Sequence, residues 1–321
     1  MGKNSFTWAV MGTGHAASKF VRDLRTLSNH KISCISSGEI ASAEKFRLNH
    51  GLISETIHHY QISCITNIDA IYIATHSNLH FECILMAMNL GVPILCEKPL
   101  SLKYNQVEEL FDLAGKLNVP LIEGIWTLFL PGINRLKQLK DDQIDTDLCK
   151  LEVSFGKKID LVQGSRLFSK EKSGGALYDL GIYPISAAIF LLGNPILEEV
   201  SVNRTKDGLI TSFNASLFFK SYGRAEIQSS LLENLPNELI LRGDSKIFRI
   251  ESPFIGNSNI YSQIRGTETV LYSSDELPGI GMWREAKFVE SVTQGTELSR
   301  LRKFQNLSLV THRILQEIEN S

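Results

Sequence analysis

This sequence lacks the features that mark several large classes of protein. Its five cysteines are odd in number and widely spaced, with no CxxC pair, so neither a disulfide framework nor a metal site is indicated. No apolar run is long enough to span a membrane. Lys and Arg (33) nearly balance Asp and Glu (35), and no basic cluster with interleaved aromatics argues for nucleic acid or an anionic membrane. We therefore expect a soluble, cytoplasmic protein whose partner is a small molecule.

The first part of the chain alternates between segments typical of strands and segments typical of helices. Short apolar runs alternate with segments of helical spacing up to about Ile125, which predicts an α/β domain with a doubly wound parallel sheet over residues 1–125. The expected strands are 6–11, 31–36, 70–75, 92–96 and 120–123, and the expected helices are 18–27, 42–50, 81–90 and 102–117.

The pattern changes in the second part of the chain. Alternating segments separated by Gly, Asn and Asp turns predict an α+β domain with a largely antiparallel, open sheet over residues 126–321. The chain of 321 residues is long enough for both domains to have their own core. The expected strands are 151–155, 199–203, 212–219, 224–230, 238–241 and 246–251, and the expected helices are 177–192, 283–293 and 298–319.

A glycine-rich turn follows the first expected strand. The pattern Gly12-x-Gly14-x-x-Ala17 lies where a dinucleotide fingerprint must lie, between the first strand and the first helix. Gly12 permits a tight turn, Gly14 lets the backbone approach the pyrophosphate, and the free amides of the helix N-terminus meet its charge. The turn could also serve only to pack helix on strand. We predict NAD(P) binding by Gly12, Thr13, Gly14, His15 and Ala16.

The end of the second strand bears on the choice of cofactor. An acidic residue there holds the adenosine ribose of NAD. This chain has Ser36, Ser37 and Gly38 instead, with no carboxylate before Glu39. The two serines leave room for the 2′-phosphate of NADP, although no arginine stands beside them. Ser36 and Ser37 are therefore predicted cofactor contacts, with NADP favoured and NAD still open.

A further set of motifs points to one family. Cys96-Glu97-Lys98-Pro99 ends a buried strand at the edge where ligands bind in doubly wound sheets. Ordered motifs extend from residue 6 to residue 195 and include 75–80, 123–131 and 174–184. On these motifs the chain resembles the Gfo/Idh/MocA oxidoreductases. The tyrosine that ends Asp179-x-Gly181-x-Tyr183 is similar to the branch with dimeric dihydrodiol dehydrogenase, glucose-fructose oxidoreductase and xylose dehydrogenases.

The resemblance implies an activity and a catalytic pair. Lys98 and Tyr183 would serve hydride transfer between nicotinamide and a hydroxyl or carbonyl carbon of a sugar, polyol or cyclic diol. The chemistry agrees, because an ammonium about 4 Å from a phenolate stabilises it by roughly 4 kcal/mol at an effective dielectric near 20. Asp179 and Tyr183, four residues apart, share a helix face. The remaining expected contacts are Thr75, His76, His80, Glu97 and Lys98 for the cofactor, and Lys98, Trp126, Arg166, Asp179 and Tyr183 for the substrate.

Each of these residues also has an ordinary structural interpretation, such as a solvated strand-end lysine, a half-buried helix aromatic or a surface ion pair. Two departures from the family pattern leave the substrate open: Leu128 stands where the branch usually has arginine, and His76 stands where proline is common. Relatives pair through the open sheet, so a homodimer or a dimer of dimers is expected. The alternative function is a non-catalytic NAD(P)-binding sensor, which would need neither Lys98 nor Tyr183.

Overall fold

The computed structural model describes residues 5–142, 148–160, 166–169, 174–274 and 279–321, with only the backbone of Leu148, Cys149 and Arg166. The chain divides into two compact units. One comprises Met1–Trp126 with Pro278–Leu309, and the other comprises Thr127–Leu277 with Val310–Ser321. The sequence had placed residues 278–309 in the second domain. The boundary near residue 125 and the substrate-binding role of the second domain remain predictions.

The first unit contains a six-stranded parallel sheet in the order β3-β2-β1-β4-β5-β6. This order reverses direction at β1 and β4, which is the topological switch of a Rossmann sheet. The strands are β1 (Phe6–Met11), β2 (His30–Ser37), β3 (Glu55–His58), β4 (Ala70–Ile73), β5 (Ile94–Glu97) and β6 (Leu121–Gly124). The helices are α1 (His15–Leu24), α2 (Ile40–Asn49), α3 (His80–Met88), α4 (Tyr104–Leu117) and α7 (Trp283–Thr293), with 3-10 turns η1 (His59–Cys64), η2 (Ser77–Leu79) and η3 (Trp126–Phe129).

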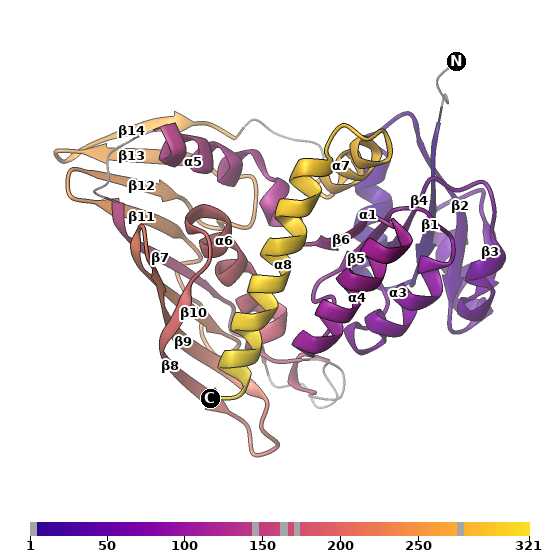
Figure 1. The fold of residues 1–321 in the computed structure, drawn as a ribbon, viewed down its shortest axis with the longest axis horizontal. Helices are drawn as coiled ribbons and strands as arrows, with labels where there is room; N and C mark the ends of the chain where they lie inside the picture. The colour runs from indigo at the N-terminus through magenta and orange to yellow at the C-terminus, as the bar shows by residue number, and fades with distance from the viewer. Residues whose placement is uncertain (1–4, 143–147, 161–165, 170–173, 275–278) are drawn as a thin grey trace. The chain divides into compact units, whose positions relative to one another are not determined.

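Both faces of this sheet are buried, as its continuous apolar strands predict. Successive side chains of a strand point to opposite faces, and β1 follows this rule. Ala9 and Met11 belong to the core cluster that includes residues of α3 and α4, which lie side by side in Figure 1. On the other face, Trp8 packs edge-on against Phe20 of α1, whose ring stacks on that of Tyr72 at 3.9 Å. The sheet is therefore covered by helices on both sides.

The second unit contains an eight-stranded sheet in the order β14-β13-β12-β11-β7-β10-β9-β8. Its neighbours are antiparallel except for the β7–β10 pair. The strands are β7 (Leu148–Gly156), β8 (Ile196–Arg204), β9 (Ile210–Phe219), β10 (Gly223–Ser230), β11 (Leu239–Gly243), β12 (Lys246–Ile250), β13 (Ile260–Ile264) and β14 (Thr267–Tyr272). The helices are α5 (Pro131–Asp142) and α6 (Ile182–Leu192), with short turns η4 (Arg166–Phe168) and η5 (Leu177–Gly181). Helix α8 (Leu298–Glu319) begins in the first unit and ends in the second.

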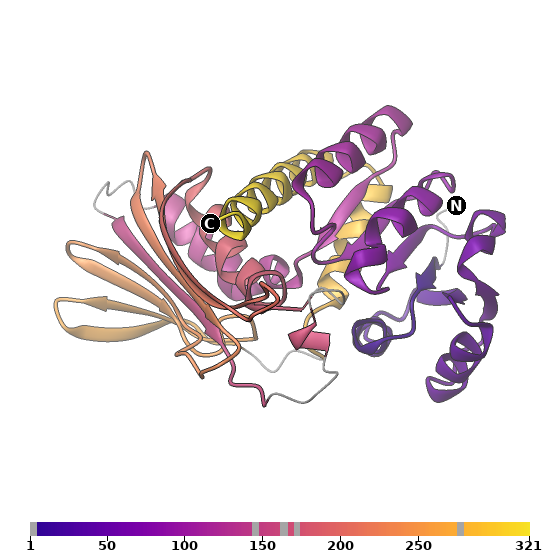
Figure 2. The same cartoon turned by 90° about the horizontal axis from the view of Figure 1, so that it is seen from below.

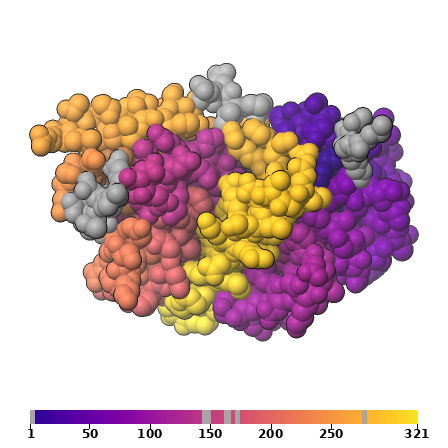
Figure 3. Space-filling view, turned by 45° about the horizontal axis from the view of Figure 1, so that its top comes forward, coloured from indigo at the N-terminus to yellow at the C-terminus, as the bar shows by residue number. Residues whose placement is uncertain are grey.

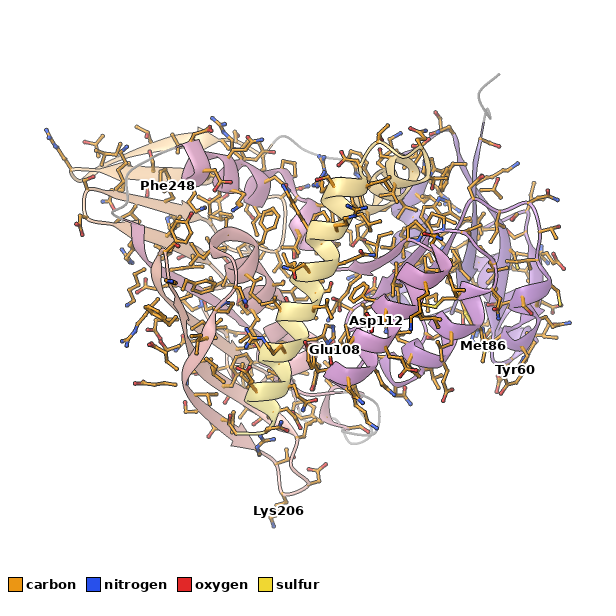
Figure 4. The ribbon with its side chains drawn as sticks, in the orientation of Figure 1. Tyr60, Met86, Glu108, Asp112, Lys206 and Phe248 are labelled. Carbon is orange, nitrogen blue, oxygen red and sulfur yellow. The ribbon has the colours of Figure 1, made fainter. Side chains whose placement is uncertain are left out.

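Helices α5 and α6 pack on one face of the second sheet (Figure 2). α6 supplies apolar residues to the core of this unit. Phe248 of β12 is also buried, with 1% of its surface exposed (Figure 4). The β13–β14 hairpin runs along the surface of the unit in orange (Figure 3), with Val270 57% exposed. This sheet therefore combines a buried face with exposed apolar side chains.

The segment that returns to the first unit is fixed there by a buried carboxylate. Asp23, on α1, accepts hydrogen bonds from the backbone N–H groups of Ile280, Gly281 and Met282 at 2.8–3.2 Å. These groups precede the first turn of α7, where a helix leaves its amides without partners inside the helix. Asn29 also donates to Glu290 at 2.9 Å. Side chains at the start of the chain thus hold a segment more than 250 residues away.

We expect Asp23→Ala to destabilise the protein by about 2–3 kcal/mol, because several buried amides lose their acceptor. Urea unfolding measures this loss. Asp23→Asn keeps one acceptor oxygen and should lose clearly less. Equal stability of the wild type and the alanine variant would contradict the role of Asp23.

The predicted fold class is confirmed: a parallel Rossmann-like sheet is joined to a second, mostly antiparallel sheet. Among the described residues, three strands (β3, β13 and β14) and one α-helix (α5) were not predicted. The expected helix 177–192 also begins differently, because Leu177–Gly181 forms a π-helical turn before α6. Within the described ranges, no helix has both the length and the apolar character of a membrane span.

Candidate functional site

The glycine turn between β1 and α1 is pressed against the end of β4. Gly12 has a φ of +113°, and a β-carbon there would lie 2.4 Å from the carbonyl oxygen of Ala74. Gly14 is the N-cap residue of α1, and a β-carbon there would have no atom within 4 Å. Gly12 is therefore required by the fold, whereas Gly14 leaves open space in front of the helix amides. This cradle fits the pyrophosphate of a dinucleotide.

The end of β2 lies beside the end of β3. The two strands are parallel, with Ser37 opposite His58. Ser36 is fully buried, and its hydroxyl lies 3.0 Å from Nδ1 of His59. Ser37 is 8% exposed, and its hydroxyl accepts from the Glu39 N–H at 3.4 Å. The two serines predicted to contact the cofactor therefore differ in the direction of their side chains, since the hydroxyl of Ser36 faces the interior.

Two buried side chains, His80 and Glu123, contact the backbone of the loop after β5. His80, 1% exposed, directs Nδ1 to the carbonyl oxygen of Pro99 at 2.7 Å, and its Nε2 lies 3.3 Å from the carbonyl oxygen of Thr75. Glu123 accepts from the N–H of Leu100 at 3.0 Å. The Lys98–Pro99 peptide is cis. These contacts fix the backbone that carries the half-buried Lys98.

His80 was predicted to contact the cofactor. Burial lowers its pKa, and the carbonyls of Pro99 and Thr75 oppose that shift. Its described contacts join the turn after β4 to the loop after β5, so they account for the residue without a ligand. Direct contact of His80 with a cofactor stays a prediction.

Glu97, which precedes Lys98 in the chain, and Glu285 are buried acidic residues. The hydroxyl of Tyr72 donates to Glu97 Oε1 at 2.6 Å. Burial raises the pKa of Glu97, and the hydrogen bond from Tyr72 and the charge of Lys98 oppose that shift. Glu285 of α7 is 0% exposed, and neither carboxyl oxygen has a partner among the described residues. Burial, then the charges of Glu97 and Asp23, raise the pKa of Glu285 well above its usual range.

We expect Glu285 to make the protein less stable as the pH rises above about 5. The unfolded chain releases the Glu285 proton near the usual pKa, while the folded chain retains it, so deprotonation favours unfolding. Glu285→Gln should remove this dependence and gain stability over the wild type by at most about 1.4 kcal/mol per pH unit. Urea unfolding at pH 5 and pH 8 measures the difference. Glu82→Gln, at an exposed position of α3, is the matched control; a gain for Glu285→Gln that is equal at both pH values would contradict the interpretation.

In the second unit, Asp179 and Tyr183 lie at the junction of η5 and α6. Gly181 allows the π-helical turn to pack, because a β-carbon there would lie 2.5 Å from the Phe213 ring. Tyr183 is 9% exposed, and its ring packs edge-on against that of Phe155 at 5.8 Å. Single π-helical turns are frequently found at functional sites. The contact with Phe155 therefore restricts the position of the Tyr183 ring.

The structure brings the predicted cofactor residues to one edge of the first sheet. Residues 12–16, 36–37, 75–76 and 97–98 lie at or just beyond the carboxyl ends of β1, β2, β4 and β5. Lys98 and the half-buried Trp126 belong to the first unit, and Asp179 and Tyr183 belong to the second. Pairing of Lys98 with Tyr183 stays a prediction. The side chain of Arg166 lies outside the described part of the chain.

Several residues around the site were not predicted. Glu123 and His59 both lie at the carboxyl edge of the sheet, since Glu123 is the last residue but one of β6 and His59 comes directly after β3. Asp23 and Glu285 gave no comparable signal, because their environment depends on segments distant in sequence. Over the described residues, no group of three or more His, Cys, Asp or Glu side chains has a metal-binding arrangement.

The chain is similar to proteins of known families and structures. Trans-1,2-dihydrobenzene-1,2-diol dehydrogenase of Xenopus tropicalis is 28% identical over 249 residues, covering 76% of this chain and 75% of that protein. The enzyme of the same name from Sus scrofa is 25% identical, covering 98% and 96%.

Two solved structures share the fold. A 3-ketoreductase from Actinomadura kijaniata, in complex with NADP and TDP-benzene, has a TM-score of 0.86 at 21% identity, covering 99% of this chain and 98% of that chain. An aldose-aldose oxidoreductase from Caulobacter crescentus, complexed with glycerol, has a TM-score of 0.85 at 18% identity, covering 98% and 96%.

Two family models match adjoining parts of the chain. Residues 6–125 match the oxidoreductase family with an NAD-binding Rossmann fold. Residues 133–249 match the GFO/IDH/MocA C-terminal domain. Together they cover most of the chain, in the order in which its two sheets occur. The protein therefore belongs to the Gfo/Idh/MocA oxidoreductase family.

Proposed function

We propose that this protein is an NAD(P)-dependent dehydrogenase or reductase that acts on the CH–OH or carbonyl carbon of a sugar, polyol or cyclic diol. The observation that carries the proposal is the shared edge of the first sheet, where the glycine cradle after β1 and Glu97-Lys98 after β5 lie together. Gly12 closes the turn against Ala74, and Gly14 leaves the helix amides open to a pyrophosphate.

The chemistry assigns a role to each residue. The nicotinamide, when bound, supplies or accepts the hydride. Tyr183 gives a proton to the substrate oxygen in reduction and takes the hydroxyl proton in oxidation. The ammonium of Lys98 stabilises the phenolate and the substrate oxygen. The backbone contacts of His80 and Glu123 keep the Lys98 loop in place. Asp179, Trp126 and Arg166 are assigned to substrate binding.

The substrate class rests on the relatives. The dihydrodiol dehydrogenases act on a cyclic diol, and the solved neighbours include a 3-ketoreductase and an aldose-aldose oxidoreductase. NADP is the proposed cofactor, supported by the serines at the end of β2 and by the NADP bound to the ketoreductase. Leu128 is 1% exposed, so its departure from the usual arginine removes a charge from this part of the chain.

We further propose a homodimer in the cytoplasm. The exposed apolar residues of the second sheet support pairing, among them Ile196 (65% exposed) and Val270 (57% exposed). The four cysteines described as free thiols support a reducing compartment. Light scattering after size exclusion at micromolar concentration tests the first proposal, and a strict monomer would remove it.

The deciding experiment is a fluorescence titration with NADPH and NADH, followed by a panel of sugars, polyols and cyclic diols monitored at the nicotinamide absorbance. Binding with turnover on at least one class of substrate is expected. Binding without turnover on any member would favour the non-catalytic sensor. Failure to bind either nucleotide would overturn the proposed function.

A further inference from the structure

One titratable side chain near the cofactor edge has no role in the mechanism above. His59 is the first residue after β3, and β3 pairs in parallel with β2. Because both strands end at the same sheet edge, His59 lies beside the loop Ser37–Glu39, where a Rossmann fold holds the adenosine ribose. The Gly12 N–H donates to the Ser36 carbonyl oxygen at 2.9 Å, which ties this loop to the glycine cradle.

The hydrogen bond to Ser36 decides which nitrogen of His59 carries the proton. The Ser36 hydroxyl is fully buried, and Nδ1 of His59, 3.0 Å away, is its partner among the described contacts. A buried hydroxyl that does not donate pays a desolvation cost, so Ser36 donates to Nδ1. Burial, then the neighbouring His58, lower the pKa of His59 to about 4, so the ring is neutral at neutral pH. In a neutral imidazole with Nδ1 as acceptor, Nε2 is the N–H donor.

That donor lies at an edge of the ring that the chain leaves uncovered. In the described structure Nε2 has no hydrogen bond, and His59 is partly exposed. A β-carbon at Gly38 would lie 3.9 Å from Cδ2, the carbon bonded to Nε2. Gly38 has no side chain to shield this edge from a ligand. Tyr60, next in the chain, is 76% exposed at the same end of the sheet (Figure 4).

We propose that His59 distinguishes NADP(H) from NAD(H) by donating its Nε2–H to the 2′-phosphate of the adenosine ribose, with the buried Ser36 as the residue that positions the ring. Phosphate oxygens only accept hydrogen bonds, so a fixed donor suits them better than it suits a hydroxyl that also needs an acceptor. The sequence Ser36–Gly38 offers no carboxylate to repel the phosphate. This inference rests on the proposed function, because it assumes that the first unit binds a nicotinamide dinucleotide.

Two conservative variants separate the two nitrogens of the ring. His59→Asn keeps a polar group near Nδ1 and loses the donor at the Nε2 position, whereas His59→Gln can retain it. We expect His59→Asn to weaken NADPH binding about tenfold or more while NADH binding changes less than about twofold. His59→Gln should recover most of the NADPH affinity. Ser36→Ala should lower NADPH affinity several-fold and leave NADH affinity unchanged.

The readout is equilibrium binding, measured by fluorescence for NADPH and NADH and by calorimetry for 2′,5′-ADP and 5′-AMP, which test the adenosine end without nicotinamide. Urea unfolding of each variant confirms that it is folded. Equal loss of both dinucleotides in His59→Asn, no loss of either, or a wild type that binds NADH and not NADPH would overturn the inference and leave the oxidoreductase function intact. A wild type that binds neither dinucleotide would overturn the proposed function and this inference with it.

Discussion

Replacing Tyr183 by phenylalanine should reduce turnover by about 10²- to 10⁴-fold, while the dissociation constant for NADPH changes less than about twofold. The substitution removes one hydroxyl, and a positioned acid or base contributes a factor of this size. The ring is retained, so its edge-on contact with Phe155 at 5.8 Å is kept. The measurement is kcat on a substrate found with the panel, together with a fluorescence titration of the same preparation.

The matched control for this prediction is Tyr178→Phe. Tyr178 is 8% exposed and lies five residues earlier, in the π-helical turn η5 that precedes α6, so its substitution removes a comparable buried phenol. We expect its turnover to stay within about threefold of the wild type. If both variants lose the same fraction of activity, the effect comes from disturbed packing at the junction of η5 and α6. If Tyr183→Phe turns over normally, Tyr183 is not the acid or base.

The two glycines of the cradle should respond in opposite ways to alanine. Gly12→Ala places a methyl group 2.4 Å from the Ala74 carbonyl oxygen at a φ of +113°, so we expect a loss of about 2–5 kcal/mol in unfolding free energy. Gly14→Ala meets no atom within 4 Å and has a φ of −81°. It should stay within about 1 kcal/mol of the wild type but bind NADPH more than tenfold more weakly, because the methyl group occupies the approach to the pyrophosphate.

Thermal unfolding and NADPH titration of the two variants separate these effects. The loss in Gly12→Ala corresponds to a fall in Tm of roughly 3–7 °C for a chain of this size. Should Gly14→Ala bind NADPH as tightly as the wild type, the pyrophosphate does not approach α1 there, and the cradle must be reassigned. A Gly12→Ala variant as stable as the wild type would instead show that the turn can move away from β4.

Several parts of the site could be predicted because their signals are local. The strand Phe6–Met11, the glycine turn and the helix that follows are adjacent in sequence, and their burial and backbone requirements are visible in the residue types themselves. The same holds for Glu97, the last residue of the apolar strand β5, and for Lys98, which follows it. The β13–β14 hairpin also had a local signal, Gly266, because glycine is common in two-residue hairpin turns. In the structure Arg265 and Gly266 both have positive φ. It was missed because the alternation of its strands is short.

Other features exist only in the folded chain. Residues 278–309 belong to the first unit because Asp23 accepts hydrogen bonds from backbone N–H groups more than 250 residues away. No sequence pattern near Asp23 or near these N–H groups predicts the contact. The pKa of Glu285 is raised because folding buries its carboxyl group near Glu97 and Asp23. Ser36 turns its hydroxyl inward because His59 lies 3.0 Å away. The sequence by itself determined the two classes of sheet and the glycine cradle, and its motifs pointed to the candidate Lys98 and Tyr183. Tertiary structure decided which polar groups are desolvated and paired, because burial and hydrogen bonding depend on neighbours that the chain brings together only on folding.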